Sequence, residues 1–165
     1  MGCFEIRVTI NRAVATVFEV YTDTEKWCRY TDISSVRWVR GNPWVVESRM
    51  RIETARGVGP AVDQVLTHFE PNSRVEYISH FLGITMQSRV SFHAVSERQT
   101  EIYGQMEFVG TGSRIVAFAI GPAIEHSTRQ FFADLKQDCE RDQAVADSVS
   151  AAVRVGIRQD KQFPS

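Results

Sequence analysis

The sequence predicts an α+β domain in which a seven-stranded, antiparallel, curved sheet wraps around one long C-terminal helix. Two short helices are expected between the first and second strands. A strand-like segment opens the chain at residues 4–10, residues 33–111 alternate between apolar and polar side chains, and a helical apolar stripe follows. We expect one domain over residues 1–145 and a flexible tail over residues 146–165, where the pattern is first small and polar and then basic.

The opening segment has the period of two that is typical of a half-buried strand. Its apolar face consists of Phe4, Ile6, Val8 and Ile10. Asn11 is expected to cap the helix that follows. The apolar side chains of that helix recur at helical spacing, and they are Val14, Val17, Phe18 and Tyr21. Residues 22–27 predict a second brief helix, with Trp27 and Tyr30 facing inward.

Residues 33–111 predict six further strands, separated by turn signals near residues 41–43, 57–60, 70–73, 82–83 and 96–98. One face is charged and the other apolar, which indicates an antiparallel sheet with one solvent-exposed side. We expect the second of these strands to begin at Trp44. Its predicted inner residues are Trp44, Val46 and Met50, and its predicted outer residues are Glu47, Arg49 and Arg51.

A long helix is expected to cover the apolar face of the sheet. It begins between Ser113 and Pro122, ends near Gln143, and carries an apolar stripe of Ile124, Thr128, Phe131, Leu135 and Cys139. The residue pair Gly121-Pro122 either starts this helix or kinks one that began at Ser113. We favour the first alternative, in which residues 118–120 form a connecting turn.

Composition excludes several classes of function. Nineteen basic and twenty acidic side chains leave a net charge of −1, so no nucleic-acid partner is expected. The longest apolar stretch, residues 115–124, is too short to span a bilayer, so we expect no integral membrane association and a cytoplasmic location. The three cysteines are far apart, which favours free thiols in a reducing compartment over a disulfide framework.

Four segments carry a resemblance to a known family. They are Ile10-Asn11-Arg12-Ala13-Val14-Ala15-Thr16-Val17-Phe18, Thr22-Asp23-Thr24-Glu25-Lys26-Trp27, residues 65–71 before a proline turn, and Leu135-Lys136 followed by Glu140. In this order they resemble the START-like (SRPBCC) superfamily with its helix-grip fold, which includes polyketide cyclase/dehydrase-like proteins, lipid-transfer domains and pollen allergen-like proteins. The resemblance covers about residues 3–143. It implies a cavity for an apolar or amphipathic small molecule between sheet and helix, and carries over no catalytic residue.

The predicted inner face is rich in aromatic and methionine side chains. Any one of them is favoured by about three to one to fill the core, because close packing is the default of an interior. As a set they indicate a ligand cavity, since a strongly curved sheet is hard to fill with side chains alone. The candidate ligand-binding residues are Trp27, Trp38, Trp44, Met50, Phe69, Tyr77, Phe81, Met86, Phe92, Gly104, Met106, Phe108, Phe131 and Leu135. Strand parity also allows Gln64 and Ser88 to point inward.

No catalytic or metal-binding motif is evident. The four histidines, His68, His80, His93 and His126, lack the spacing of metal ligands, so we expect no metal and no cofactor. Tyr77 is a weak catalytic candidate, because a phenol in an apolar pocket can polarise a carbonyl. The sequence therefore favours binding of a lipid, polyketide or aromatic compound. A polyketide cyclase or dehydratase and a protein-interaction module, such as a homodimer, are the alternatives.

Overall fold

The computed structural model describes residues 3–55, 60–81, 83–110 and 113–159, with the backbone alone for residues 113, 114, 116, 117 and 142–159. Its elements follow the predicted order. They are β1 (Cys3–Ile10), α1 (Val14–Thr22), α2 (Thr24–Trp27), β2 (Ile33–Arg40), β3 (Arg49–Thr54), β4 (Val62–Glu70), β5 (Arg74–Phe81), β6 (Ile84–Ser96), β7 (Gln99–Val109) and α3 (Ser113–Gln159). The sequence prediction of the fold class is confirmed.

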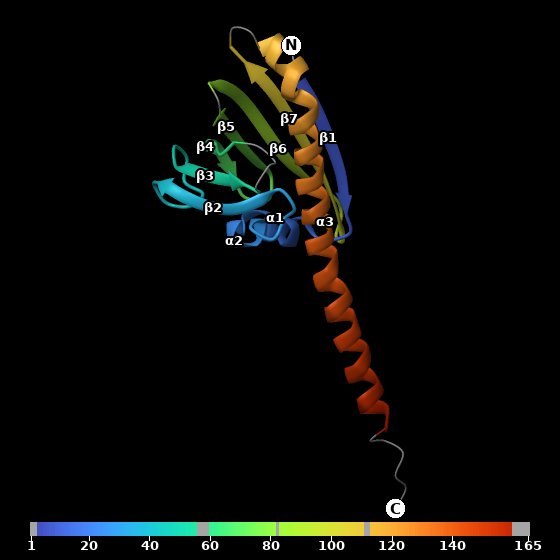
Figure 1. Cartoon of the computed structure of the whole chain (residues 1–165). Coiled ribbons are helices and arrows are strands. Elements are labelled where there is room, and N and C mark those ends of the chain that lie inside the picture. The colour runs from blue at the N-terminus through green and yellow to red at the C-terminus, as the bar shows by residue number, and fades with distance from the viewer. Residues whose placement is uncertain (1–2, 56–59, 82, 111–112, 160–165) are drawn as a thin grey trace, which may run out of the picture.

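The strands form one antiparallel sheet of seven strands in the order β1-β7-β6-β5-β4-β3-β2. β1 and β2 are therefore the two edges, although they are neighbours in the chain. Figure 1 shows the sheet curving away from α3, which runs along β1 and β7, while β2 and β3 lie on the opposite side. The short helices α1 and α2 close one end of the resulting cup (Figure 1).

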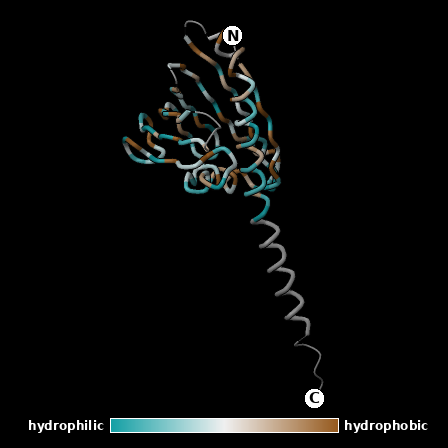
Figure 2. The backbone as a smooth tube through the Cα atoms, viewed as in Figure 1, coloured by the Kyte–Doolittle hydropathy of each residue, from teal (hydrophilic) through white to brown (hydrophobic). Residues whose placement is uncertain are grey.

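Alternating side chains determine which face of the sheet is buried. In β7 every second residue from Thr100 to Phe108 is buried, and the residues between them are half-buried. Figure 2 shows the same alternation of hydrophobic and hydrophilic residues along the strands. Because the side-chain period of a strand is two, this pattern directs one face toward α3 and the other toward solvent.

The start of β3 differs from the prediction. Residues 41–48 form a turn, and β3 begins only at Arg49. Trp44 and Glu47 have φ angles of 61° and 71°, which interrupt the extended backbone that alternation requires. The prediction that Val46 lies inside is wrong, since its side chain is 48% exposed. Met50, by contrast, is buried as predicted.

A β-bulge changes the register in β4. The pairing with β5 shifts between Leu66 and His68. Before the shift, Leu66 is buried and Gln64 faces the cavity described below, whereas after it Phe69 packs against the core. Simple alternation would place residues 65 and 69 on one face, and the extra residue of the bulge explains why Gln64 and Phe69 both point inward.

Helix α3 is longer than the sequence indicated. It begins at Ser113 and contains Pro122, so the preferred start at the Gly121-Pro122 pair is wrong and the alternative is correct. The helix also continues to Gln159, although no helical pattern was recognised beyond residue 145. The flexibility expected for residues 146–159 stays a prediction, and residues 160–165 lie outside the described residues.

The turn between β1 and α1 is fastened to α3. Asn11 makes no capping bond to α1, contrary to expectation. Its backbone nitrogen and its Nδ2 instead donate to Glu140 Oε1 over 3.1 and 3.2 Å, and Lys136 Nζ reaches the same oxygen at 2.7 Å. Arg12 Nε donates to the carbonyl of Cys139 at 2.9 Å. These bonds hold α3 across the closed end of the sheet.

Candidate ligand-binding cavity

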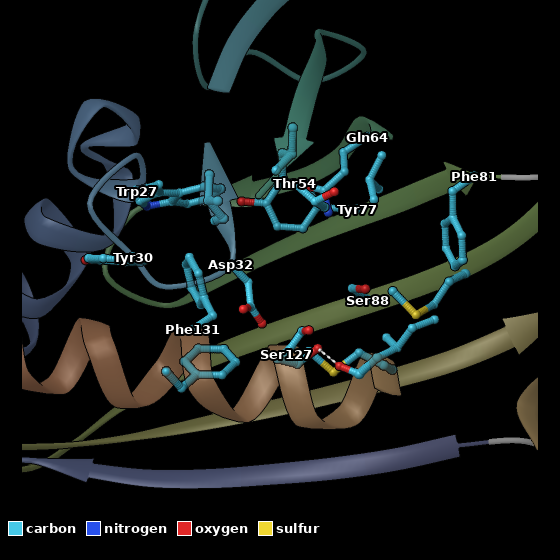
Figure 3. Close-up of a pocket in the computed structure, with 18 of the residues that line it drawn as sticks. Trp27, Tyr30, Asp32, Thr54, Gln64, Tyr77, Phe81, Ser88, Ser127 and Phe131 are labelled. Carbon is cyan, nitrogen blue, oxygen red and sulfur yellow. Dashed lines mark hydrogen bonds between the residues drawn. The ribbon is translucent and has the colours of Figure 1, made fainter. Parts of the chain in front are cut away.

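A cavity of about 360 Å³ lies between α3 and the concave face of the sheet. Figure 3 shows side chains from the sheet, from the α2–β2 connection and from α3 converging on it. Its apolar and aromatic lining residues are Tyr21, Trp27, Tyr30, Ile33, Ile52, Pro60, Val62, Tyr77, Phe81, Met86, Met106, Ile120, Ala123, Ile124, Phe131 and Phe132. Its other lining residues are Asp32, Thr54, Gln64, Ser88, Ser127, Thr128 and Asp134.

The central strands supply the floor of the cavity. Tyr77, Met86 and Met106 come from β5, β6 and β7, and each occupies a buried position of the alternating pattern. Ser88 lies directly opposite Tyr77 and Met106 in the strand register. Because serine is small, this position leaves space above the middle of the sheet that a large apolar residue would fill.

Phe131 belongs to a group of aromatic side chains in the cavity wall. Its ring makes edge contacts with Trp27, Tyr30 and Phe132, with ring centroids 5.0, 5.3 and 5.4 Å apart. Phe131 is half-buried, whereas the neighbouring Phe132 is 2% exposed. Both rings line the cavity, but Phe132 is packed more deeply than Phe131.

Two buried tyrosines meet at the inner end of the cavity. The hydroxyl groups of Tyr21 and Tyr77 share a hydrogen bond of 3.1 Å. Burial raises the pKa of both phenols above the ordinary value of 10.0, so both are neutral at physiological pH. A neutral phenol donates one hydrogen bond and accepts others, and the pair can therefore also bind a ligand oxygen.

Replacing Tyr77 with phenylalanine is expected to destabilise the protein by about 1–3 kcal/mol, because the Tyr21 hydroxyl then stays buried without its partner. The double variant Tyr21→Phe/Tyr77→Phe should recover part of this loss, since no buried hydroxyl is left unpaired. Urea unfolding of the parent, the single variant and the double variant measures the effect. Equal stability of the single variant and the parent would show that the pair contributes nothing.

Six of the fourteen predicted ligand-binding residues line the cavity, and they are Trp27, Tyr77, Phe81, Met86, Met106 and Phe131. Four others belong to the aromatic cluster next to it, and they are Trp38, Trp44, Phe69 and Phe92. The remaining four are buried in the core away from the cavity lining, and they are Met50, Gly104, Phe108 and Leu135.

Gly104 accommodates a side chain of α3. A Cβ atom at this position would lie 3.4 Å from Phe132 Cε2 and 3.4 Å from Met106 Cε. The missing side chain therefore makes room for the Phe132 ring, so Gly104, a candidate ligand-binding residue, serves the packing of α3 against the sheet. A phenylalanine there would strain the packing between α3 and the sheet.

Sequence reasoning missed the residues contributed by the α2–β2 connection and by the first turns of α3. Asp32, Ile120, Ala123 and Ser127 line the cavity but were not predicted to do so. Asp32 follows the second short helix, where no periodicity applies, and the three α3 residues lie near the misplaced helix start. A longer helical stripe beginning at Ser113 was the one signal that could have revealed the three α3 residues.

None of the four histidines, all of which lie in the described part of the chain, lines the cavity. His80, His93 and His126 are exposed, and His68 is half-buried beside Glu70, with 3.8 Å between Nε2 and Oε2. Among the described residues, no group of three or more histidine, cysteine, aspartate or glutamate side chains is arranged to hold a metal ion. None of the described helices is long and apolar enough to cross a membrane.

A family model described as polyketide cyclase/dehydrase and lipid transport matches residues 1–140. The chain belongs to this family. The match includes every strand, both short helices and the cavity-lining part of α3, so the family shares the architecture described above. A comparison with curated proteins finds no significant match.

Solved structures show the same fold at low sequence identity. Ara h 8.0201 has 13% identity and a TM-score of 0.73, with 84% of this chain and 97% of that chain covered. The Zhui aromatase/cyclase from Streptomyces sp. R1128 has 13% identity and a TM-score of 0.71, with 84% and 93% covered. A START superfamily protein from Mycobacterium smegmatis has 14% identity and a TM-score of 0.61, with 82% and 97% covered. These likenesses show that the chain has the fold that the resemblance implied.

Proposed function

We propose that the protein binds a hydrophobic small molecule, such as a lipid, a polyketide or an aromatic compound, in the cavity between the sheet and α3. The observation that carries this proposal is a preformed cavity with largely aliphatic, aromatic and thioether walls. Its volume of about 360 Å³ lies within the range that small-molecule sites occupy. Membership of a family described by polyketide chemistry and lipid transport supports the same class of ligand.

Apolar burial supplies the driving force in this proposal. A ligand gains roughly 25 cal/mol for each Å² of apolar surface that it removes from water, so the cavity walls favour any apolar molecule of suitable shape. The thioethers of Met86 and Met106 are flexible and polarisable, which lets the floor adapt to different ligands. Few polar groups are available, so shape contributes more than charge to affinity.

A polyketide cyclase or dehydratase is a second candidate. The Asp32 carboxylate and the Tyr77 hydroxyl belong to the same cavity, which supplies an acceptor and a donor for acid–base chemistry. In this role the cavity would fold a linear poly-β-ketone so that its reacting carbons meet. Incubation with such a substrate followed by mass spectrometry tests for turnover, because cyclisation with dehydration yields a product lighter by water.

Ser127→Trp should weaken binding strongly by filling the cavity. Ser127 lies on α3, and its side chain points into the cavity (Figure 3). The matched control is His126→Trp, which adds the same indole to the neighbouring, exposed position. We expect saturable fluorescence enhancement of the neutral probe N-phenyl-1-naphthylamine with the parent and the control, and at least about tenfold weaker binding with Ser127→Trp. Equal binding by all three proteins would contradict the proposed site.

A further inference from the structure

The charged groups of the cavity carry one sign. Among the described lining residues, the charged side chains are the carboxylates of Asp32 and Asp134, and no lysine, arginine or histidine is present. A basic residue in an apolar cavity would attract the carboxylate of a fatty acid. Acidic groups in the same position repel it. The position and partners of each carboxylate therefore decide what the polar end of a ligand meets.

Asp134 is already engaged in structural contacts. Its Oδ2 accepts a hydrogen bond of 2.8 Å from the backbone nitrogen of Thr31, and its Oδ1 accepts one of 3.0 Å from Gln130 Nε2. Both oxygens of this carboxylate thus have donors from the protein. The bond to Thr31 also ties the residue before Asp32 to α3.

Asp32 has a fixed backbone and an available carboxylate. Its carbonyl accepts a hydrogen bond of 2.9 Å from the nitrogen of Ala55, and the next residue, Ile33, donates over 3.2 Å to the carbonyl of Tyr30. Within the described part of the chain, no hydrogen bond or ion pair reaches the carboxylate itself. Figure 3 shows this group directed across the cavity toward α3.

We propose that Asp32 anchors the polar end of the bound molecule, so that the cavity prefers a ligand with an ammonium or hydroxyl group over one with a carboxylate. The proposal rests on the binding function proposed above and adds the chemical class of the ligand. An ionised carboxylate accepts hydrogen bonds and donates none, so it pairs with O–H and N–H groups. Asp32 is half-buried beside apolar walls, where charge interactions are stronger than in bulk water.

Three naphthalene derivatives with the same ring system test this preference. They are 2-naphthylmethylamine, 2-naphthylmethanol and 2-naphthoate, each titrated at neutral pH by calorimetry. We expect the amine and the alcohol to bind the parent more tightly than the carboxylate. Asp32→Asn should weaken amine binding by about tenfold, the ratio expected for losing one hydrogen bond to a charged group, and should strengthen binding of 2-naphthoate.

Controls separate the anchor from the cavity. Glu97→Gln removes the same charge from an exposed turn and should leave all three affinities unchanged. N-phenyl-1-naphthylamine is uncharged and has neither an ammonium nor a hydroxyl group, so Asp32→Asn should change its binding far less than that of 2-naphthylmethylamine. Similar thermal unfolding of that variant and the parent would exclude loss of folding as the cause.

The possible outcomes separate the role of Asp32 as an anchor from the proposed ligand-binding function. If the neutral probe binds but the three derivatives bind the parent equally and Asp32→Asn changes nothing, the anchor is refuted and the cavity remains a binding site. If neither the probe nor any derivative binds the parent, the binding function is refuted together with the anchor. Tighter binding of 2-naphthoate than of the amine would also overturn the proposal.

Discussion

Replacing Phe132 with alanine is expected to lower the free energy of unfolding by about 3–5 kcal/mol, the range for a fully packed aromatic residue. Phe132 is 2% exposed and fits above Gly104, so its removal leaves a hole between α3 and the sheet. Phe131→Ala is expected to cost less, because that ring is only half-buried and therefore loses fewer packing contacts.

Guanidinium unfolding of the parent and both variants measures this contrast. The neighbouring positions share one helix and one residue type, so helix propensity and side-chain size are matched. A larger loss of stability for Phe131→Ala than for Phe132→Ala would contradict this account, because it would show that Phe131 is the more tightly packed of the two rings. Losses near zero for both would show that α3 does not pack against the sheet.

Trp27→Ala is expected to destabilise by a similar amount, about 3–5 kcal/mol, because it removes both packing and a hydrogen bond. The indole is 3% exposed, and its Nε1 donates to the carbonyl of Tyr21 over 2.9 Å. Its ring contacts Phe131, with centroids 5.0 Å apart, so its loss should also enlarge the cavity.

Trp27→Phe provides the control for this position. It keeps an aromatic ring and loses the N–H group, so it should retain more stability than Trp27→Ala. Thermal unfolding monitored by circular dichroism compares the two variants. If both variants destabilised the protein equally, the contribution of Trp27 to stability would come from its hydrogen bond, and packing of the indole against Phe131 would be unimportant.

The fold could be predicted because most strands obey the period of two. In β5, β6 and β7 the inner residues Tyr77, Met86 and Met106 follow from alternation alone. These strands lie in the middle of the sheet, where pairing on both sides keeps the backbone regular. Their side chains form the floor of the cavity, so that part of the candidate site was also accessible from the sequence.

Irregular backbone explains the failures. Trp44 and Val46 alternate in sequence as if in a strand, yet the φ of 61° at Trp44 starts a turn instead. The indole there is positioned by tertiary contacts, since its Nε1 donates to the carbonyl of Thr22 over 2.8 Å and its ring stacks on Phe69. Such contacts between distant segments leave no periodic signal.

The part of the lining that includes Asp32 and Ser127 was the least predictable part of the site. Asp32 lies in the connection between α2 and β2, where the backbone of Thr31 is bound by Asp134 of α3 and the carbonyl of Asp32 by Ala55, the residue after β3. Ser127 follows a proline that the sequence suggested as a helix start but that the helix accommodates. Neither side chain could be assigned to the cavity before the connections between these segments were known.

Methionine methyl resonances test most directly whether ligands occupy the cavity. Met86 and Met106 line it, while Met50 is 1% exposed and buried outside it, so the protein contains its own internal control. Titration of isotope-labelled protein with N-phenyl-1-naphthylamine should shift the Met86 and Met106 methyl signals, through ring currents of the bound probe, and leave Met50 unchanged. Saturable binding of the probe without shifts at Met86 and Met106 would contradict the account.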